Sequence, residues 1–244
     1  MEKWQERTAL LFKEKGLEAL KNSNVLVVGL GGVGSFAAEF IARAGVGKMT
    51  IVDGDVVDIT NINRQLPALH STVGLDKVHV VGDRLMDINP QLELTRVKEF
   101  LSPERAFELV DPQFDFVLDC IDSVTPKLNL IKAAKRKKVK LISSMGAGGK
   151  MEAAKVKVAD ISQTKNCFFA KVIKKRLREM KIDKGIKVVF SSEIQDASSL
   201  KTTDGSNFKK SFYGTNSYMP GLFGLYAAEY VIRKLLEKAE PTEL

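Results

Sequence analysis

The stretch that most constrains the fold of this chain runs from Asn24 to Asp55. An apolar run at 25–28 is short enough for a buried strand, and the turn Gly-Leu-Gly-Gly-Val-Gly follows it directly. Small and apolar residues at 36–44 predict a helix, and a second strand at 49–52 ends in Asp53. Strand, glycine turn, helix, strand and acid, in this order, are typical of a dinucleotide-binding unit.

The chemistry of this unit predicts a bound nucleotide. Glycines let the chain turn tightly and bring backbone amides close to a phosphate, and the N-terminus of the next helix adds partial positive charge. The carboxylate of Asp53, at the end of the second strand, can accept hydrogen bonds from a ribose. These features do not choose between NAD, FAD and ATP.

The pattern of the whole chain predicts an α/β fold. Strands and helices alternate up to about residue 143, which indicates a Rossmann-like, mainly parallel sheet with helices on both faces. Helices are expected at 7–20, 75–88, from 103 onward and at 126–138, with strands at 92–97, 114–118 and 139–143. Beyond residue 150 we expect a short C-terminal extension: added strands at 155–158 and 187–190, a basic helix at 167–180 and a closing helix at 219–236.

No linker interrupts the sequence, so we expect a single domain over 1–244. Residues 191–218 are rich in Ser, Thr, Asn and Gly and are predicted to form a flexible loop within it. The loop at 55–74 is rich in Asn, Arg and Gln, and a loop of that length is usually functional.

Composition excludes several classes of protein. Hydrophobic content of 44% and charged content of 28% are ordinary for a globular domain. The two cysteines, Cys120 and Cys167, form no C-x-x-C pair, which argues against a disulfide framework and a four-cysteine zinc site. Both are interpreted as packed side chains, with exposure of Cys120 to the site as the alternative. The charged N-terminus and the lack of an apolar run of ~18–20 residues argue against secretion and a membrane, so a cytoplasmic location is expected.

The net charge of +8 is concentrated in two segments. Residues 132–140 hold six basic residues and no acidic one, and residues 171–187 hold eight basic residues against two acidic ones. The remainder of the chain is therefore net negative. Such local excess favours a face that binds a polyanion, although two solvated helix faces would give the same pattern.

Four further residues carry chemistry that suits a triphosphate. Arg64 offers a guanidinium fork for phosphoryl oxygens, and Lys77 lies near the start of a helix, where it could neutralise a leaving pyrophosphate. Asp122 follows a buried strand and could hold Mg²⁺ or cap the next helix. Arg7 precedes the nucleotide unit and could reach a nucleotide, including one in a partner subunit. Each basic residue alone would also fit a plain surface charge.

Taken together, these motifs resemble a known superfamily. The glycine turn, Asp53-x-Asp55, Asn61-x-x-Arg64-Gln65, Lys77 and Asp119-Cys-Ile-Asp122-Ser are similar, in order and spacing, to the adenylating enzymes of the ubiquitin-activating, MoeB and ThiF superfamily. The stretch 7–53 and the motifs DSVTPK, MGAGGK and KVIKKRLRE further resemble its tRNA threonylcarbamoyladenosine dehydratase branch, over about residues 6–236 and most weakly at 191–218.

The resemblance implies ATP and Mg²⁺ as cofactors. The residues implied to bind ATP are Gly29, Gly31, Gly32, Gly34, Asp53, Asp55, Asn61, Arg64, Gln65 and Lys77. Asp122 would coordinate Mg²⁺, and Arg64, Lys77, Asp122 and Arg7 would be the catalytic residues, with Arg7 crossing a homodimer as in relatives. The paired C-x-x-C zinc motif of the MoeB and ThiF branch is missing, and no cysteine lies at 191–218, so a persulfide or thioester step is not expected.

The function implied is activation of a carboxylate on tRNA. The enzyme would adenylate the carboxylate of N6-threonylcarbamoyladenosine at position 37, and a neighbouring atom of the same substituent would close a ring, giving the cyclic form with loss of water. The anticodon stem-loop would bind the basic segments, through Lys171, Lys174, Lys175, Arg176 and Arg178 in particular. A sulfur-transfer or cysteine-desulfurase partner is also allowed by the resemblance.

Three alternatives remain at this point. One is adenylation of the C-terminus of a ubiquitin-like sulfur carrier, which would require a peptide groove and commonly a zinc site. Another is a nucleotide-binding scaffold without turnover, against which the joint presence of Arg64, Lys77 and Asp122 argues. The third is an NAD dehydrogenase, for which no His or Lys is evidently placed.

Overall fold

The computed structural model describes residues 2–202 and 211–238, and its centre is one seven-stranded sheet. The strand order is β3-β2-β1-β4-β5-β7-β6. All neighbouring strands pair in parallel except β6, which is antiparallel to β7. The strands are β1 (Asn24–Val28), β2 (Lys48–Val52), β3 (Glu93–Val97), β4 (Phe116–Asp119), β5 (Leu141–Ser144), β6 (Val156–Asp160) and β7 (Lys187–Ser191).

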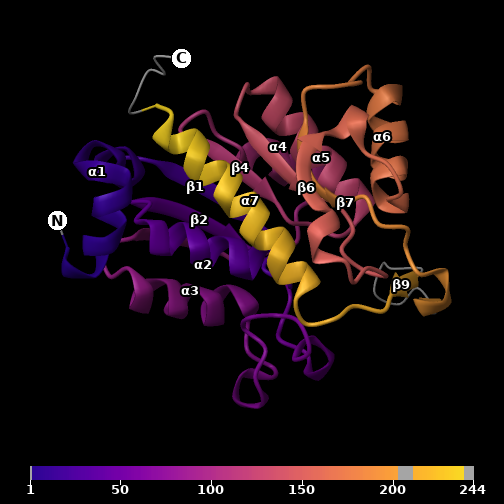
Figure 1. Ribbon diagram of the computed structural model, residues 1–244, viewed down its shortest axis with the longest axis horizontal. Helices are drawn as coiled ribbons and strands as arrows, with labels where there is room; N and C mark the ends of the chain where they lie inside the picture. The colour runs from indigo at the N-terminus through magenta and orange to yellow at the C-terminus, as the bar shows by residue number, and fades with distance from the viewer. Residues whose placement is uncertain (1, 203–210, 239–244) are drawn as a thin grey trace.

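Helices cover both faces of this sheet, as the sequence predicts (Figure 1). One face packs against α1 (Glu6–Lys21), α2 (Gly34–Ala44), α3 (Lys77–Ile88) and α7 (Met219–Leu236). The other packs against α4 (Pro103–Leu109), α5 (Val124–Arg136) and α6 (Phe168–Glu179). Strand β1 shows why both faces of the sheet are covered. Its side chains alternate, so that Val25 and Val27 pack in one hydrophobic core and Leu26 and Val28 in the other.

The expected helices and strands are present, with shifts of one or two residues at most ends. Ser102 caps α4, and its hydroxyl accepts a hydrogen bond from the Arg105 amide, as predicted. Helix α5 begins at Val124, two residues before Pro126, because a proline is tolerated anywhere in the first turn. Its N-cap is Ser123, so the capping alternative for Asp122 is wrong.

The segment 191–218 is not wholly loop in its described part. Strand β8 (Leu200–Thr202) pairs antiparallel with β9 (Ser211–Tyr213), and residues 203–210 between them lie outside the described residues. Both strands are short and largely exposed, so they lack the apolar alternation by which a strand is recognised in a sequence. The expected flexibility of this segment stays a prediction.

The segment between β2 and α3, residues 53–76, projects from the body below the sheet (Figure 1). Two short 3₁₀ helices, η2 (Ile59–Asn61) and η3 (His70–Thr72), replace the plain loop that was expected. A bridge between Val56 and Asp76 closes its base. We call residues 53–76 the crossover segment. No helix in the described ranges is long and apolar enough to span a membrane.

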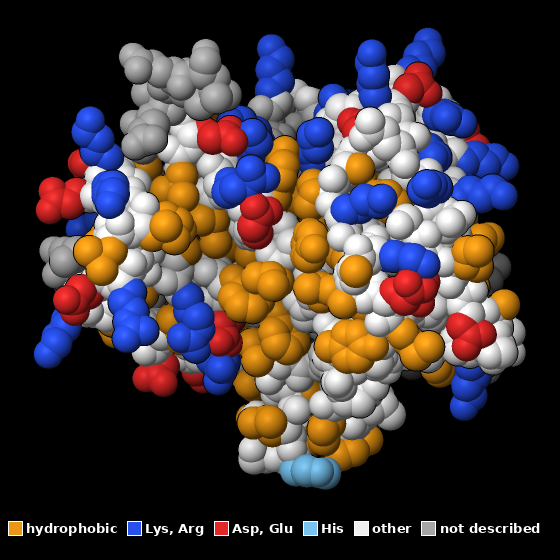
Figure 2. All heavy atoms as spheres, viewed as in Figure 1, with side chains coloured by type: hydrophobic (Ala, Val, Ile, Leu, Met, Phe, Trp, Pro, Cys, Tyr) orange, Lys and Arg blue, Asp and Glu red, His pale blue; other side chains and the backbone are white. Residues whose placement is uncertain are grey.

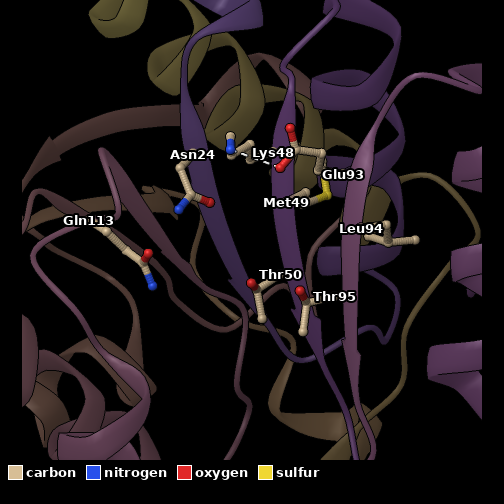
Figure 3. A pocket seen from close by; sticks show the side chains of 8 residues that line it. All are labelled: Asn24, Lys48, Met49, Thr50, Glu93, Leu94, Thr95 and Gln113. Carbon is tan, nitrogen blue, oxygen red and sulfur yellow. Dashed lines mark ion pairs between the residues drawn. The ribbon is translucent and has the colours of Figure 1, made fainter.

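A polar hollow of about 370 Å³ lies on the sheet where no helix covers it (Figure 3). Asn24, Lys48 and Glu93, which line it, are the first residues of β1, β2 and β3, and Lys48 pairs with Glu93 at 2.8 Å. The hollow is therefore at the amino ends of the strands. Ligands of open parallel sheets bind at the carboxyl ends, where the glycine turn lies, so the nucleotide site is sought there.

Candidate nucleotide site

The glycine turn connects β1 to α2 and is shaped by close backbone packing. Gly29 adopts a φ of +89°, a conformation that side chains disfavour. A Cβ on Gly34 would overlap the carbonyl oxygen of Gly29, whereas a Cβ on Gly31 would meet only the Gln65 amide, at 3.7 Å. Helix α2 begins without a side-chain cap; the Ser35 amide donates to the Gly31 carbonyl at 3.2 Å, and the neighbouring amides of the first turn are the ones that a phosphate could use.

Asp53 ties this turn to the end of β2. One carboxylate oxygen accepts a hydrogen bond from the Leu30 amide at 2.6 Å, and the other accepts one from the Asp55 amide at 2.8 Å. Burial raises the pKa of Asp53, and the bond from the Leu30 amide opposes that rise. Asp53 therefore holds the turn in place, in addition to the ribose contact predicted from the sequence.

The crossover segment brings Arg64 to the site. The Arg64 Nη1 atom donates to the carbonyl oxygen of Thr60 at 2.9 Å and to Oδ1 of Asn63 at 2.8 Å. Burial lowers the pKa of the guanidinium, and the carboxylate of Asp122 acts in the opposite direction. Arg64 and Asp122, 58 positions apart in the sequence, thus lie close enough for their charges to interact. A guanidinium remains charged in proteins, so the site offers a fixed positive charge.

Asn61 serves the fold of the same segment. Asp58 caps η2, and its amide donates to Oδ1 of Asn61 at 3.2 Å, so Asn61 completes a capping box. Its side chain is largely buried. The structure therefore shows a local structural role for Asn61, and its contact with ATP stays a prediction.

Lys77 begins α3, and only 5% of its surface is exposed. Its Nζ lies 3.0 Å from Oδ2 of Asp55, and its amide donates to the Asp55 carbonyl at 3.1 Å. Asp55 thereby fixes the direction of the lysine side chain. The positive charge of Lys77 also lowers the pKa of Asp53, so these three residues share one electrostatic environment.

The side chain of Gln65 lies beside Gly31 and carries an acceptor that is unpaired in the described part of the chain. Within the described residues, its Oε1 is buried and has no hydrogen-bond partner. A buried acceptor left unpaired costs ~1–3 kcal/mol, which a donor on a bound ligand would recover. A ribose hydroxyl or the adenine amine of ATP carries such a donor, so the residues present fit a nucleotide.

An ion pair beneath the site was missed in the sequence. Lys127 and Asp119 are both fully buried, with Nζ 2.8 Å from Oδ2. Ser143 on β5 donates to the same carboxylate oxygen at 2.6 Å, and Oδ1 of Asp119 accepts from the Ile121 amide at 3.2 Å. This network anchors the turn that carries Asp122. The sequence did contain an indication of a buried lysine, because Lys127 lies on the apolar face of α5, three residues before Leu130.

A Mg²⁺ ion would be held here by the carboxylate of Asp122. Among the described residues, no group of three or more His, Cys, Asp or Glu side chains is arranged to hold a metal. Mg²⁺ usually keeps several waters and binds one or two carboxylates plus phosphate oxygens, so a multi-residue cage is not needed. Asp122 is exposed at the carboxyl edge of the sheet and fits that role together with a triphosphate.

Neither cysteine is placed as an exposed nucleophile. Burial raises the pKa of the Cys120 thiol to about 12, and the carboxylate of Asp119 adds to that rise. The backbone and Cβ of Cys120 pack against Gly29 and Gly34. Cys167 is buried among the residues under α6. Cys167 is a packed small side chain, as the sequence predicts, whereas Cys120 packs against the core but stays partly exposed.

Arg7 lies at the other end of the molecule from the glycine turn. It is exposed near the start of α1, and its neighbour Gln5 packs on Gly45, the C-cap of α2. Because the glycine turn is at the opposite end of α2, Arg7 does not reach the site of its own chain. Any contact of Arg7 with a nucleotide would have to involve a second subunit.

The predicted tRNA-binding residues lie on α6, and Lys and Arg side chains gather over this region on the right of Figure 2. Lys171 and Lys175 are exposed. Lys174 differs, because its Nζ donates to the carbonyl oxygen of Thr164 at 3.0 Å, so its charge is partly used within the fold. Arg176 and Arg178 are exposed and form loose pairs with Glu179 and Asp183, at 3.6 and 3.7 Å.

A Rossmann-like sheet with this glycine turn, and with Arg64, Lys77 and Asp122 at its carboxyl edge, defines a nucleotide-binding protein. The chain belongs to the ThiF family, whose sequence model matches residues 5–244. This confirms the superfamily resemblance of its motifs.

Relatives of known identity match nearly the whole chain. It is 41% identical to the tRNA threonylcarbamoyladenosine dehydratase of Bacillus subtilis over 241 residues, which cover 96% of this chain and 95% of that protein. The structure is similar to that of the Escherichia coli dehydratase TcdA in complex with AMP, with a TM-score of 0.88, 34% identity and coverage of 99% and 98% of the two chains. The complex of TcdA with ATP gives a TM-score of 0.86. Molybdopterin-synthase adenylyltransferase of Escherichia coli matches less of the chain, with 41% identity over 58% of this chain and 55% of that protein.

Proposed function

We propose that this protein is an ATP-dependent tRNA threonylcarbamoyladenosine dehydratase. It adenylates the carboxylate of N6-threonylcarbamoyladenosine at position 37 of tRNA and promotes its cyclisation with loss of water. The observation that carries the proposal is full-length similarity to dehydratases, one of which binds AMP and ATP in its structures, together with a matching phosphate-binding edge in this chain. Adenylation of a ubiquitin-like sulfur carrier is the weaker alternative, because adenylyltransferases of that type match just over half of the chain.

Adenylation requires a charged, preorganised site. A carboxylate is a poor electrophile, and attack on the α-phosphate of ATP makes it an acyl-adenylate with pyrophosphate as the leaving group. The amides at the start of α2 would bind phosphate oxygens. Arg64 and Lys77, each held by neighbouring oxygens, would stabilise the charge that develops on the pyrophosphate without having to reorganise.

Mg²⁺ bound by Asp122 would supply further neutralisation of the triphosphate. The position of Asp122 follows from the buried network below it, because Asp119 fixes the Ile121 amide one residue earlier. The carboxylate of Asp122 also acts electrostatically on the Arg64 guanidinium, so the residue that would hold the metal and the residue that would bind the phosphates lie near each other.

Ring closure needs no group from a cysteine. In the acyl-adenylate, a nucleophilic atom of the same substituent already lies next to the activated carbonyl, which gives it a large effective concentration. Its attack forms the ring bond and breaks the carbonyl–AMP bond, and a proton leaves the nucleophile. One carboxylate oxygen departs with AMP, so the nucleoside loses the elements of one water. The raised pKa of Cys120 agrees with a route without a thioester.

We further propose that the protein works as a homodimer in which Arg7 of one subunit approaches the nucleotide of the other. The support is that α1 holds Arg7 away from its own site while leaving Leu10 and Leu11 more than two-thirds exposed. A second subunit would cover these leucines. The sulfur-transfer or cysteine-desulfurase partner stays a prediction.

The direct test is to incubate the protein with ATP, Mg²⁺ and tRNA carrying threonylcarbamoyladenosine, and to analyse the nucleosides by mass spectrometry. We expect an ATP-dependent product lighter by one water, with one AMP formed per ring. A ubiquitin-like carrier protein supplied in place of tRNA serves as the comparison. Adenylation of the carrier with an unchanged nucleoside would refute the proposal.

A further inference from the structure

We propose that four exposed side chains beside the nucleotide site form an apolar platform on which an unstacked base of the tRNA anticodon loop rests. These residues, called the platform below, are Met151, Phe168, Ile194 and Tyr218. Between 49% and 78% of the surface of each is exposed. The inference rests on the proposed function and adds to it the place where the substrate loop binds.

Two of the platform segments are joined through Glu193. Both of its carboxylate oxygens accept hydrogen bonds from the Met151 amide, at 3.0 Å each, and Ile194 is the next residue in the chain. The Tyr218 hydroxyl donates to the Met151 carbonyl at 2.9 Å. Met151, Ile194 and Tyr218 are therefore brought into one region from three separate parts of the sequence.

The start of α6 joins the same region. The Phe168 amide donates to Oε1 of Gln195 at 3.2 Å, and Gln195 in turn donates to the Gly148 carbonyl at 3.0 Å. The buried Lys150 ammonium donates to the carbonyl oxygens of Glu193 and Asn166, at 2.7 and 3.3 Å. The Lys150 contacts lie beneath the surface and hold the backbone, while the apolar side chains of the platform stay outside.

The platform adjoins the nucleotide site through the segment that precedes α7. Asn63 of the crossover segment donates to the Thr215 carbonyl at 2.9 Å. Gly32 of the glycine turn lies so close to Pro220 that an added Cβ would be 2.9 Å from the proline ring. Tyr218 lies between these two anchors in the sequence, so the platform borders the edge where ATP is expected.

A basic stripe leads away from the platform along α6. Phe168, Lys171, Lys175 and Arg178 are spaced at i, i+3, i+7 and i+10, which places them on one helix face, and all four are exposed. Ala170, Ile173 and Leu177 are buried on the opposite face. Ten residues of helix span ~15 Å, so the positive charges extend that far from the aromatic ring.

This order of groups fits an RNA stem-loop. Loop bases leave their stack and bind aromatic side chains, whereas the stem offers only its phosphates and shape to basic residues. The reacting carboxylate is attached to a base, so that base must approach ATP while the stem extends outward. The platform beside the nucleotide site can bind the base. The basic stripe, which extends away from that site, can bind the phosphates of the stem.

The test compares Phe168→Ala, Phe168→Leu and Phe168→Tyr in the full-length protein. The ligand is an anticodon stem-loop RNA carrying threonylcarbamoyladenosine, and its binding is measured over a range of salt concentrations. We expect about tenfold weaker binding for the Ala and Leu variants, as loss of one base–aromatic stack gives, with the same salt slope as the wild type. The Tyr variant keeps the ring and should bind like the wild type. The Lys171→Ala, Lys175→Ala double variant should bind more weakly with a shallower salt slope.

ATP binding by calorimetry should be close to wild type in all Phe168 variants, because the ring contacts the RNA and not the nucleotide. Wild-type RNA binding by Phe168→Ala, full binding by Phe168→Leu, or a change in oligomeric state alone would overturn the platform. If the wild-type protein itself neither binds nor converts the RNA, the proposed function fails, which is a distinct outcome.

Discussion

Replacement of Lys127 by Met should strongly destabilise the protein. The change removes one partner of a fully buried ion pair and leaves the carboxylate of Asp119 in the interior with Ser143 and the Ile121 amide as its remaining partners. Methionine has a similar length, so it leaves little cavity. Breaking a buried pair on one side costs ~3–5 kcal/mol, because the remaining charge is desolvated without compensation.

The free energy of unfolding at pH 7, from urea denaturation, measures this cost. A matched control is Lys155→Met, which removes one partner of the exposed Lys155–Glu152 pair at the same separation, 2.8 Å. Exposed pairs contribute ~0–1 kcal/mol, so the control should change stability little. Equal effects of the two substitutions would show that burial does not determine the strength of the pair.

The double variant Lys127→Met, Asp119→Asn distinguishes the free energy lost with the ion pair from the cost of burying an unpaired carboxylate. With both charges removed, no carboxylate is left unpaired, and we expect much of the stability to return. If the network positions the turn that carries Asp122, the affinity for ATP should also be lowered in Lys127→Met and should partly return in the double variant. A double variant no more stable than Lys127→Met would refute the explanation by an uncompensated charge.

The remaining predictions concern the site and the RNA surface. Arg64→Ala or Asp122→Ala should abolish tRNA-dependent ATP–pyrophosphate exchange, and near-normal exchange would remove these residues from the triphosphate site. Replacing Lys175, Arg176 and Arg178 by Ala should weaken tRNA binding and lower its salt slope by ~1 for each phosphate that is no longer neutralised; Arg233→Ala, on an exposed part of α7, is the control, and an unchanged slope would indicate a plain solvated helix. The double variant Cys120→Ala, Cys167→Ala should keep cyclisation activity, because the pKa of the Cys120 thiol is raised and Cys167 is buried under α6, and complete loss in a folded protein would indicate covalent catalysis.

The sequence by itself determined the order of the elements and the class of ligand. The glycine turn and the run that precedes it are local patterns, and their conformations depend on neighbouring residues, so β1, α2 and β2 were predicted within two residues. The closing helix, Met219–Leu236, was predicted with the bounds that the structure shows, because it is a long, mostly apolar segment with a proline in its first turn. The family was also evident, since its motifs keep a characteristic order and spacing.

Only the tertiary structure decided which of these residues meet. It pairs Lys127 with Asp119, sets Arg64 beside Asp122 and uses Lys174 within the fold, and it leaves Arg7 far from its own glycine turn. It also inserts β7 between β5 and β6. These outcomes depend on how separate elements pack against one another, and a local pattern of polar and apolar residues does not specify which partner a side chain meets.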